Sequence, residues 1–247
     1  MSTTPTSSPA GWYPAPDGSP ATWWWDGARW TPPGSQPSQQ PTTTNAITKL
    51  ATATQVLLAV CGVMSVITIG VETFGISAVT GYLNGHAAAI DLLNSYDQIT
   101  FVVTILSVVA LLATGVLWVL WQYRAAKHLP GHTRRSPGWH VGSWFVPVIC
   151  VWFPYQNISD LWRAVGRSRP AWQILWWLCW LVSNVLIQIS SRIYTSAQDL
   201  DQFRVAMSVS IAGEVLLLAA APLAWLIVRG ITEGIVRRSA VHVALTY

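Results

Sequence analysis

The hydrophobic residues of this chain are gathered into four long runs that polar segments separate. The runs cover residues 51–71, 99–121, 172–191 and 207–228. About 20 residues of α-helix cross the ~30 Å hydrocarbon core of a bilayer, and each run has about that length. Helix is expected, because an isolated strand in lipid would leave its backbone hydrogen-bonding groups unpaired. The pattern therefore predicts four membrane-spanning helices.

A fifth apolar run, residues 139–153, is shorter and carries Pro147 in its middle. As a straight helix it would reach only about 22 Å. If it does not cross and the N-terminus is cytoplasmic, twelve of the 14 lysines and arginines face inward and only Arg192 and Arg204 face outward. If it crosses, the split is eight to six. The positive-inside rule therefore favours four spans, both termini in the cytoplasm, and a segment that dips into the inner leaflet or lies along it.

An amphipathic helix is expected directly after this run. Ile158, Leu161, Trp162 and Val165 recur at the helical period. We expect this helix to lie on the cytoplasmic interface, so that residues 139–167 form one re-entrant or interfacial segment. Tryptophans near the ends of the runs are typical of the interfacial aromatic belt. They are Trp118, Trp121, Trp172 and Trp225.

Segments rich in Ser, Thr, Pro and Gln flank an aromatic island near the N-terminus. Such segments bury too little apolar surface to become ordered. No charged start and apolar stretch fall within the first 30 residues or so, so the first run is expected to stay as an uncleaved anchor. The predicted organisation is a disordered tail (1–10), an aromatic module (11–32), a flexible linker (33–48), a membrane domain (49–236) and a cytoplasmic tail (237–247).

Composition agrees with a membrane protein. Hydrophobic residues make up 52% of the 247 residues and charged residues only 10%, against about 25% charged in soluble domains. The net charge of +4 does not indicate nucleic-acid binding, because the basic residues flank apolar runs. Cys61, Cys150 and Cys179 lie inside apolar stretches and show no paired spacing. The predicted fold class is an all-α integral membrane protein with a small tryptophan-rich β-hairpin module.

The aromatic island contains GWYPAPDG followed by WWWDGARW. Asp26 and Gly27 between aromatic residues predict a two-residue hairpin turn. With that turn Trp24 opposes Arg29, which permits a cation–π pair on one face of the sheet. Trp23 opposes Trp30 on the other face.

The second face of the hairpin is expected to hold a small aromatic core. Exposed aromatic residues in a small sheet are one means of docking proline-rich segments. A purely structural or membrane-surface role is the alternative, because a module this short is only marginally stable alone. The candidate partner-binding residues are Trp12, Tyr13, Trp23, Trp24, Trp25, Arg29 and Trp30.

Glu214 is the acidic residue that falls inside a predicted span, and such groups are candidate functional sites by default. Asn184 lies at the same expected depth in the preceding span, and Gln188 is one turn above it. We therefore expect a polar cluster of Glu214, Asn184 and Gln188. The cluster either joins the two helices by hydrogen bonds or lies on a proton or ion path.

Basic side chains on the expected cytoplasmic side form a second candidate site. Anionic lipid headgroups are the expected partners, and solvated topology anchors are the alternative. The residues are Arg124, Lys127, Arg134, Arg135, Arg163, Arg167 and Arg169. His128 and His132 are separated by Pro130 and Gly131, which interrupt the helix that a metal site would need. No catalytic motif appears, so we expect no enzymatic activity, cofactor or metal.

Two stretches resemble known families of unassigned function. The pattern GWYPAPDG with WWWDGARW resembles the short module called Domain of Unknown Function 2510, which is common in actinobacterial membrane and signalling proteins. The stretch SPGWHVGSWFVPVICVWFPYQNISDLWRA, with the preceding WQYRAAKHL, resembles Domain of Unknown Function 4328, a four-helix membrane family. The second resemblance runs over roughly 46–236 and implies the same membrane class and an actinobacterial source. It supplies no catalytic residues.

The leading functional hypothesis is a non-enzymatic scaffold or sensor in the plasma membrane. It would recruit a protein partner to the cytoplasmic side through the aromatic module, on a linker that reaches roughly 20 to 25 Å. The alternative is a small transporter, channel or accessory subunit that uses the cluster around Glu214.

Overall fold

The computed structural model of this chain describes residues 9–33, 39–86 and 88–244, and of residues 39–44 and 242–244 only the backbone. The chain divides into two units, residues 1–43 and 44–247. About 75% of it is helical. The predicted disorder of residues 1–8 and 34–38 lies outside the described residues.

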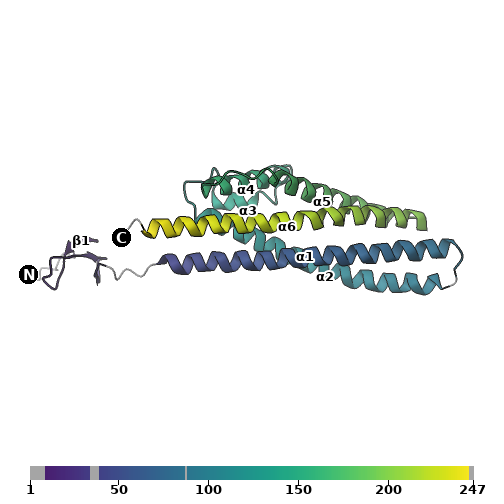
Figure 1. Ribbon diagram of the computed structural model, residues 1–247, viewed down its shortest axis with the longest axis horizontal. Coiled ribbons are helices and arrows are strands. Elements are labelled where there is room, and N and C mark those ends of the chain that lie inside the picture. Colours follow the sequence, from purple (N-terminus) through teal and green to yellow (C-terminus); the bar gives the residue numbers. More distant parts are fainter. Residues whose placement is uncertain (1–8, 34–38, 87, 245–247) are drawn as a thin grey trace, which may run out of the picture. The chain divides into compact units, whose positions relative to one another are not determined.

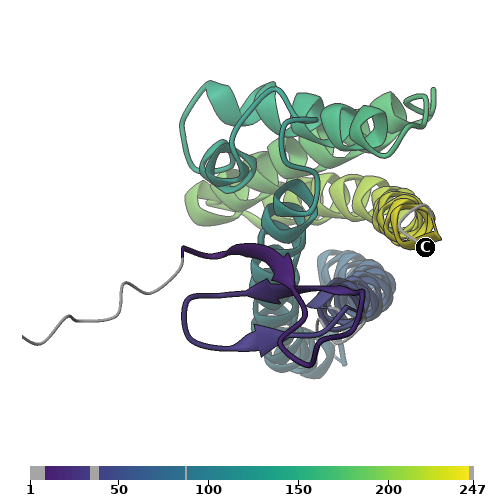
Figure 2. The same cartoon turned by 90° about the vertical axis from the view of Figure 1, so that its left-hand side faces the viewer.

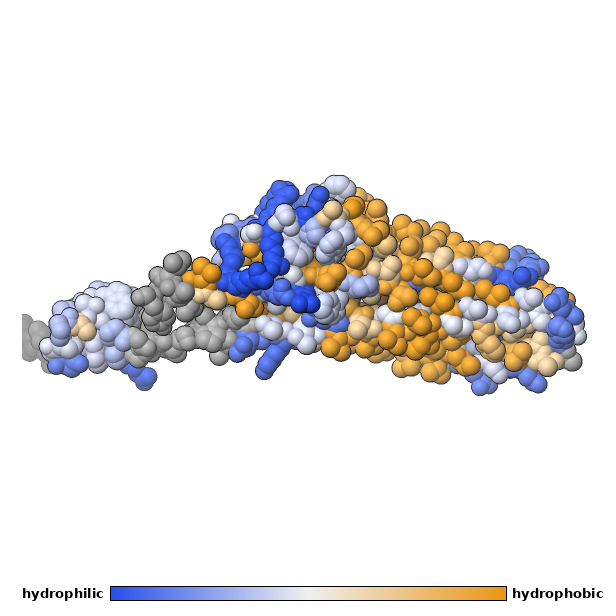
Figure 3. Space-filling view, in the orientation of Figure 1, coloured by the Kyte–Doolittle hydropathy of each residue, from blue (hydrophilic) through white to orange (hydrophobic). Residues whose placement is uncertain are grey.

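Four long helices make up most of the second unit (Figure 1). They are α1 (Gln39–Leu83), α2 (Ala89–Lys127), α5 (Gln173–Ser196) and α6 (Leu200–Ala244). All four are long and apolar enough to cross a membrane, as predicted. Leu112 is 64% exposed and Val63 is 59% exposed in the middle of their helices. An apolar surface of this extent needs an apolar surrounding, and it covers the middle of the long helices (Figure 3).

The long helices extend beyond the predicted runs. α1 begins at Gln39 and thus includes the second half of the segment predicted as a linker. Pro41 is compatible with this start because it lies in the first turn, where its missing N–H forfeits no helical hydrogen bond. α6 continues to Ala244, through most of the predicted tail.

Helices α5 and α6 form a tightly packed hairpin. A Cβ atom built on Gly213 would lie 3.0 Å from Ile187 Cγ1 and 3.4 Å from Leu186 Cβ. Ser190 Oγ donates a hydrogen bond to the Ala206 carbonyl at 2.8 Å. The α5 face that meets α6 is therefore the one with Ser183, Leu186, Ile187 and Ser190.

Between α2 and α5 the chain forms a cap of short helices. They are α3 (Pro137–Gly142), the 3-10 helix η1 (Ile149–Val151) and α4 (Phe153–Ala164). None of them is long enough to cross a bilayer, in agreement with the prediction for this segment. Val148 between α3 and η1 is 84% exposed, and Phe145 is 74% exposed. The cap therefore presents an apolar loop on its outside.

The apolar face of α4 is buried in the protein and not turned toward lipid. Ile158 and Leu161 have no exposed surface. A Cβ atom on Gly230 of α6 would lie 2.2 Å from Trp162 Cη2, and one on Gly234 would lie 2.7 Å from Val165 Cβ. These two glycines let α4 approach α6 closely, so the apolar face of α4 is part of the protein core, and its expected position on the cytoplasmic interface stays a prediction.

A cluster of tryptophans forms the centre of this core. Trp121 is fully buried and Trp118 is 7% exposed. Both were expected in an interfacial belt, but they lie in the core, where Trp118 contacts Trp144 of the cap and Trp121 contacts Thr232 of α6. Their rings lie 5.5 Å apart, and Trp177 stacks on Trp180 at 5.1 Å. The cluster consists of Trp118, Trp121, Trp144, Trp176, Trp177 and Trp180.

The first unit contains a three-stranded antiparallel sheet in the order β1-β2-β3 (Figure 2). Its strands are β1 (Gly11–Pro14), β2 (Thr22–Trp25) and β3 (Trp30–Thr31). The sequence predicted only the hairpin of β2 and β3. The strand β1 adds GWYP to the other edge of β2, with Trp12 opposite Trp24 and Tyr13 opposite Trp23.

The register of the β2-β3 hairpin differs from the prediction. Trp25 opposes Trp30 and Trp24 opposes Thr31, so Arg29 is not opposite Trp24. Asp26 explains the difference, because its Oδ1 accepts hydrogen bonds of 2.7 Å from the N–H groups of Ala28 and Arg29. The turn therefore contains four residues, closed by a bond from Asp26 N to Arg29 O. The predicted cation–π pair is replaced by a turn that holds Arg29 at the tip.

Candidate functional site

The sheet of the first unit carries aromatic residues on both faces. On one face the rings of Trp12 and Trp24 meet edge to face at 5.5 Å. On the other face Trp30 contacts Tyr13 at 6.0 Å and Trp25 at 4.9 Å. Trp12 is 56% exposed. The sheet therefore presents one well-exposed indole that a second indole supports from the side.

The predicted intramembrane cluster of Glu214, Asn184 and Gln188 does not form. Asn184 and Gln188 are exposed on α5, and Asn184 Nδ2 donates to the Trp180 carbonyl of its own helix at 2.7 Å. The α5 face toward α6 contains Ser183 and Ile187, each of which directly precedes one of these two residues in the sequence. Gly213 of α6 contacts α5 there.

A different polar network joins the four long helices. Glu72 of α1 is 7% exposed and accepts a hydrogen bond of 2.9 Å from the Tyr96 hydroxyl of α2. That hydroxyl also shares a hydrogen bond of 2.5 Å with the Tyr194 hydroxyl of α5. Ser210 and Glu214 of α6 lie within electrostatic reach of the same carboxylate. Glu214 therefore belongs to a polar network, but with other partners than predicted.

Sequence reasoning missed Glu72 because the first predicted run ended at residue 71. The signal was present, since the apolar pattern continues after Glu72 through FGISAV. The helix continues to Leu83 and so places this carboxylate inside a candidate span. A Cβ atom on Gly75 would lie 2.5 Å from the Tyr96 ring, so the glycine makes room for the tyrosine that binds Glu72.

The predicted headgroup-binding residues divide into two groups. Arg124 and Lys127 are exposed at the end of α2. The others contact the cap or α6. Arg135 donates to Gln156 Oε1 and Asn157 Oδ1, and its guanidinium lies 3.8 Å from the centre of the Phe153 ring. Arg135 is thus a structural part of the cap.

Asp160 forms ion pairs with two more of these basic residues. It is 4% exposed, and its Oδ1 lies 3.5 Å from Arg134 Nε and 3.7 Å from Arg163 Nη1. Arg169 lies over the Tyr155 ring at 5.5 Å. Arg167 pairs with Glu233 at 3.9 Å and is considered below.

His140 is buried inside the cap and was not singled out by sequence reasoning. It has no exposed surface, and neither ring nitrogen makes a hydrogen bond with any residue that the structure describes. Burial, and to a smaller extent the nearby charge of Arg135, lowers the pKa of His140 to about 4. The imidazole is therefore neutral at pH 7.

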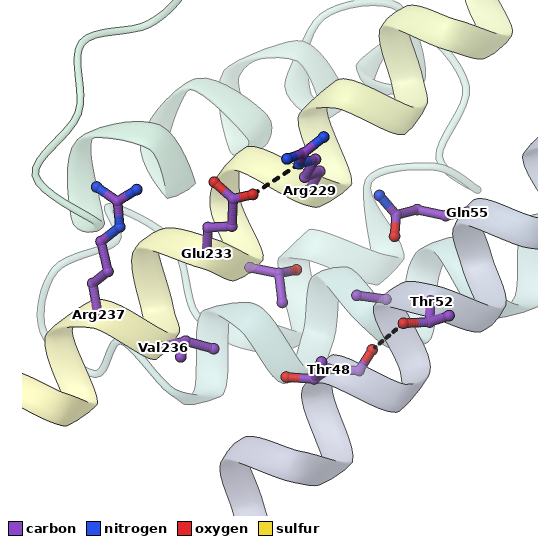
Figure 4. A pocket seen from close by; sticks show the side chains of 9 residues that line it. Thr48, Thr52, Gln55, Arg229, Glu233, Val236 and Arg237 are labelled. Atoms are coloured by element: carbon purple, nitrogen blue, oxygen red, sulfur yellow. Dashed lines mark hydrogen bonds and ion pairs between the residues drawn. The ribbon is translucent and has the colours of Figure 1, made fainter.

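A cavity of about 320 Å³ lies between α1 and α6 (Figure 4). Thr48, Thr52 and Gln55 line it from α1. Arg229 lines it from α6 and donates to Glu233 Oε1 at 2.8 Å. Arg237 also borders the cavity but extends away from Thr48 and Thr52 (Figure 4). The cavity thus has a polar rim, and the guanidinium of Arg229 in this rim is already paired with Glu233.

Comparison with known proteins gives one finding for this chain. Residues 85–233 match the model of the family described as domain of unknown function DUF4328. The match covers more than half of the chain and runs from the start of α2 into α6. No curated protein and no solved structure matches. The matched range excludes the N-terminal sheet and α1, so the resemblance of the aromatic module to Domain of Unknown Function 2510 stays a prediction.

Proposed function

Because the chain belongs to the family described as domain of unknown function DUF4328, its role has to be inferred from its own residues, and we propose a non-enzymatic membrane scaffold or sensor. The first unit recruits a partner, and the helices of the second unit anchor it in the plasma membrane. The exposed Trp12 on the sheet carries this proposal. The resemblance to the module common in actinobacterial signalling proteins agrees with it.

The partner that fits the Trp12 face is an extended proline-rich segment. Such segments are preformed and bind between aromatic side chains at a low entropic cost. Trp12 and Trp24 meet at an edge-to-face angle of 68°, so together they present two differently oriented aromatic surfaces. A flat proline ring packs well on an indole face. The opposite face holds Tyr13, Trp25 and Trp30 in mutual contact and serves to stabilise the sheet.

The layout of charges supports a cytoplasmic position for both termini. With both termini on the cytoplasmic side, twelve of the 14 basic residues lie on the inner side. The exposed loop with Phe145 and Val148 then enters the inner leaflet beside the arginines of the cap. Anionic headgroups at this surface would pair with the exposed Arg124 and Lys127.

The Trp12→Ala variant tests the docking proposal. We expect it to weaken binding of a fluorescent polyproline peptide to the full-length protein at least tenfold, because an anchoring tryptophan contributes about 2 kcal/mol or more. Fluorescence anisotropy on protein in nanodiscs measures the dissociation constant. Trp139→Ala is the matched control, since Trp139 is 45% exposed but lies in the second unit. Equal affinity of Trp12→Ala and the wild type would contradict the proposal.

A second candidate function is proton or cation transport, and the network around Glu72 favours it. A buried carboxylate in a span is costly in lipid and is typical of transport pathways. Contributions from α1, α2, α5 and α6 meet at this carboxylate. Movement of any one of these helices would change its surroundings.

Replacing Glu72 with Gln tests the transport function. We expect proton flux into proteoliposomes to fall about tenfold or more, because the amide cannot carry the proton, while assembly is preserved by the similar shape. A pH-sensitive dye inside the vesicles records the flux. Asp201→Asn controls for loss of a carboxylate on the same end of the bundle, since Asp201 is exposed. Absence of flux in the wild type would rule out this function.

A further inference from the structure

A second cavity of about 420 Å³ lies between the end of α4 and the end of α6. Arg167 lines it from the segment after α4, and Arg237 and Arg238 line it from α6. Gly166 and Gly234 form part of its wall. Three guanidinium groups from two distant parts of the sequence therefore border one cavity.

Two glycines bring these arginines together. Gly166 has a φ of 77°, a left-handed conformation that turns the chain after α4 back toward α6. Gly234 faces Val165 so closely that a Cβ atom there would lie 2.7 Å from Val165 Cβ. The close approach places Arg167 beside α6, at the level of Arg237 and Arg238.

Backbone carbonyls hold two of the three arginines in place. Arg167 Nη1 donates to the Gly230 carbonyl at 3.1 Å, and Arg238 Nη1 donates to the Ala164 carbonyl. Each of these bonds uses one N–H of a group that has five, and Arg238 Nη2 also lies 3.3 Å from His132 Nε2. The remaining donors are held in fixed directions, so a ligand would not have to order them on binding.

The positive charge in this cavity is only partly compensated. Glu233 Oε1 accepts from Arg229 at 2.8 Å, and its Oε2 lies 3.9 Å from Arg167, but Glu233 does not line the cavity. Within the part of the chain that the structure describes, Arg237 makes no hydrogen bond or ion pair. Figure 4 shows Glu233 turned toward Arg229.

We propose that this cavity binds a phosphate group. Guanidinium groups bind phosphate oxygens in pairs of parallel hydrogen bonds, which explains why arginines are the preferred residues for such ligands. The cavity is larger than one phosphate and leaves room for the glycerol or sugar attached to it. A lipid headgroup or a soluble phosphate compound offers the same chemistry. The site is independent of the N-terminal sheet and of the network around Glu72.

The position of the cavity brings a lipid headgroup within reach. Hydrophilic side chains of the cap and of the α6 end adjoin the apolar surface of the long helices (Figure 3). Val241 in the cavity lining is 59% exposed and continues the apolar surface past the arginines. A headgroup in the cavity could thus keep its acyl chains beside α6.

The Arg237→Gln variant tests the site, because the Arg237 side chain makes no hydrogen bond or ion pair with the described residues, so its loss should leave the fold intact. Native mass spectrometry of full-length protein measures binding of phosphatidic acid against phosphatidylcholine, and calorimetry in detergent measures binding of pyrophosphate. We expect Arg237→Gln to weaken binding of the phosphate probe about tenfold. Arg192→Gln is the matched control, since Arg192 is an exposed arginine of α5 outside the cavity.

The two probes distinguish the source of the phosphate. Binding of phosphatidic acid alone supports a lipid site, and binding of pyrophosphate supports a site for soluble phosphates. If neither probe binds, or if Arg237→Gln and Arg192→Gln weaken binding equally, the proposal is overturned. Equal losses would mean that general surface charge attracts the probe.

Discussion

Replacement of Trp121 with Ala should lower the free energy of unfolding of the protein by about 3–5 kcal/mol, the range for removal of a large aromatic side chain from a packed core. Trp121 is fully buried. Its ring lies 5.5 Å from that of Trp118, and its Nε1 donates to Thr232 Oγ1 of α6 at 3.0 Å. The variant therefore loses packing and also leaves a buried hydroxyl with one hydrogen bond fewer.

Equilibrium unfolding in mixed micelles, followed by tryptophan fluorescence, measures this loss. Trp152→Ala is the matched control, because Trp152 is 60% exposed and its removal should change stability by less than about 0.5 kcal/mol. Trp121→Phe should give an intermediate loss, since it keeps a six-membered aromatic ring and removes the five-membered ring that carries the N–H donor. Equal stability of Trp121→Ala and Trp152→Ala would show that the core does not form as described.

Acidification should destabilise the cap through His140. Its pKa is about 4 in the folded protein because of burial and then of Arg135, against 6.5 in the unfolded chain. Between these two values the unfolded chain binds a proton that the folded protein does not. Stability therefore falls as the pH drops from about 6.5 to 4, by about 3 kcal/mol for the 2.5-unit difference.

The pH dependence of unfolding of wild type and of His140→Leu tests this prediction. The variant should lose this part of the acid sensitivity, because leucine has no proton to bind. His86→Gln controls for the loss of a histidine as such, since His86 is exposed and lies outside the cap. Identical pH profiles of His140→Leu and the wild type would show that His140 is not the responsible group.

The four long helices could be predicted because hydropathy over 20 residues depends on the chain alone. Their ends could not be predicted in the same way. Glu72 interrupts the apolar run, and only its hydrogen bond with Tyr96 shows why a carboxylate is tolerated inside α1. A bond between residues 24 positions apart leaves no periodic mark in the sequence.

Helix faces were harder to predict than helix positions. Asn184 and Glu214 have similar expected depths, yet α5 meets α6 through Ser183 and Ile187, a rotation of one residue. Depth follows from counting along the helix, whereas rotation depends on which neighbour packs best. The same limit applies to Trp121, which is buried among residues far away in the sequence, such as Thr232 of α6.

At the tip of the hairpin a two-residue turn competes with a four-residue turn, and the sequence motif alone does not decide between them. Asp26 and Gly27 suited a two-residue turn, but the Asp26 carboxylate binds the N–H groups of Ala28 and Arg29. These bonds favour the longer turn, and they lower the pKa of the Asp26 carboxyl below its usual value. The third strand was missed because β1 has only four residues and ends in Pro14.

Gly230 and Gly234 of α6 determine the position of α4 along this helix, because only a glycine leaves room for the side chains that pack there. Trp162 fits against Gly230 and Val165 against Gly234. A slide of one turn, about 5.4 Å, would press Trp162 onto Leu226 in one direction or Val165 onto Arg238 in the other. The two glycines therefore fix the register of α4 along α6, and α4 can shift along this helix only if the two helices first move apart.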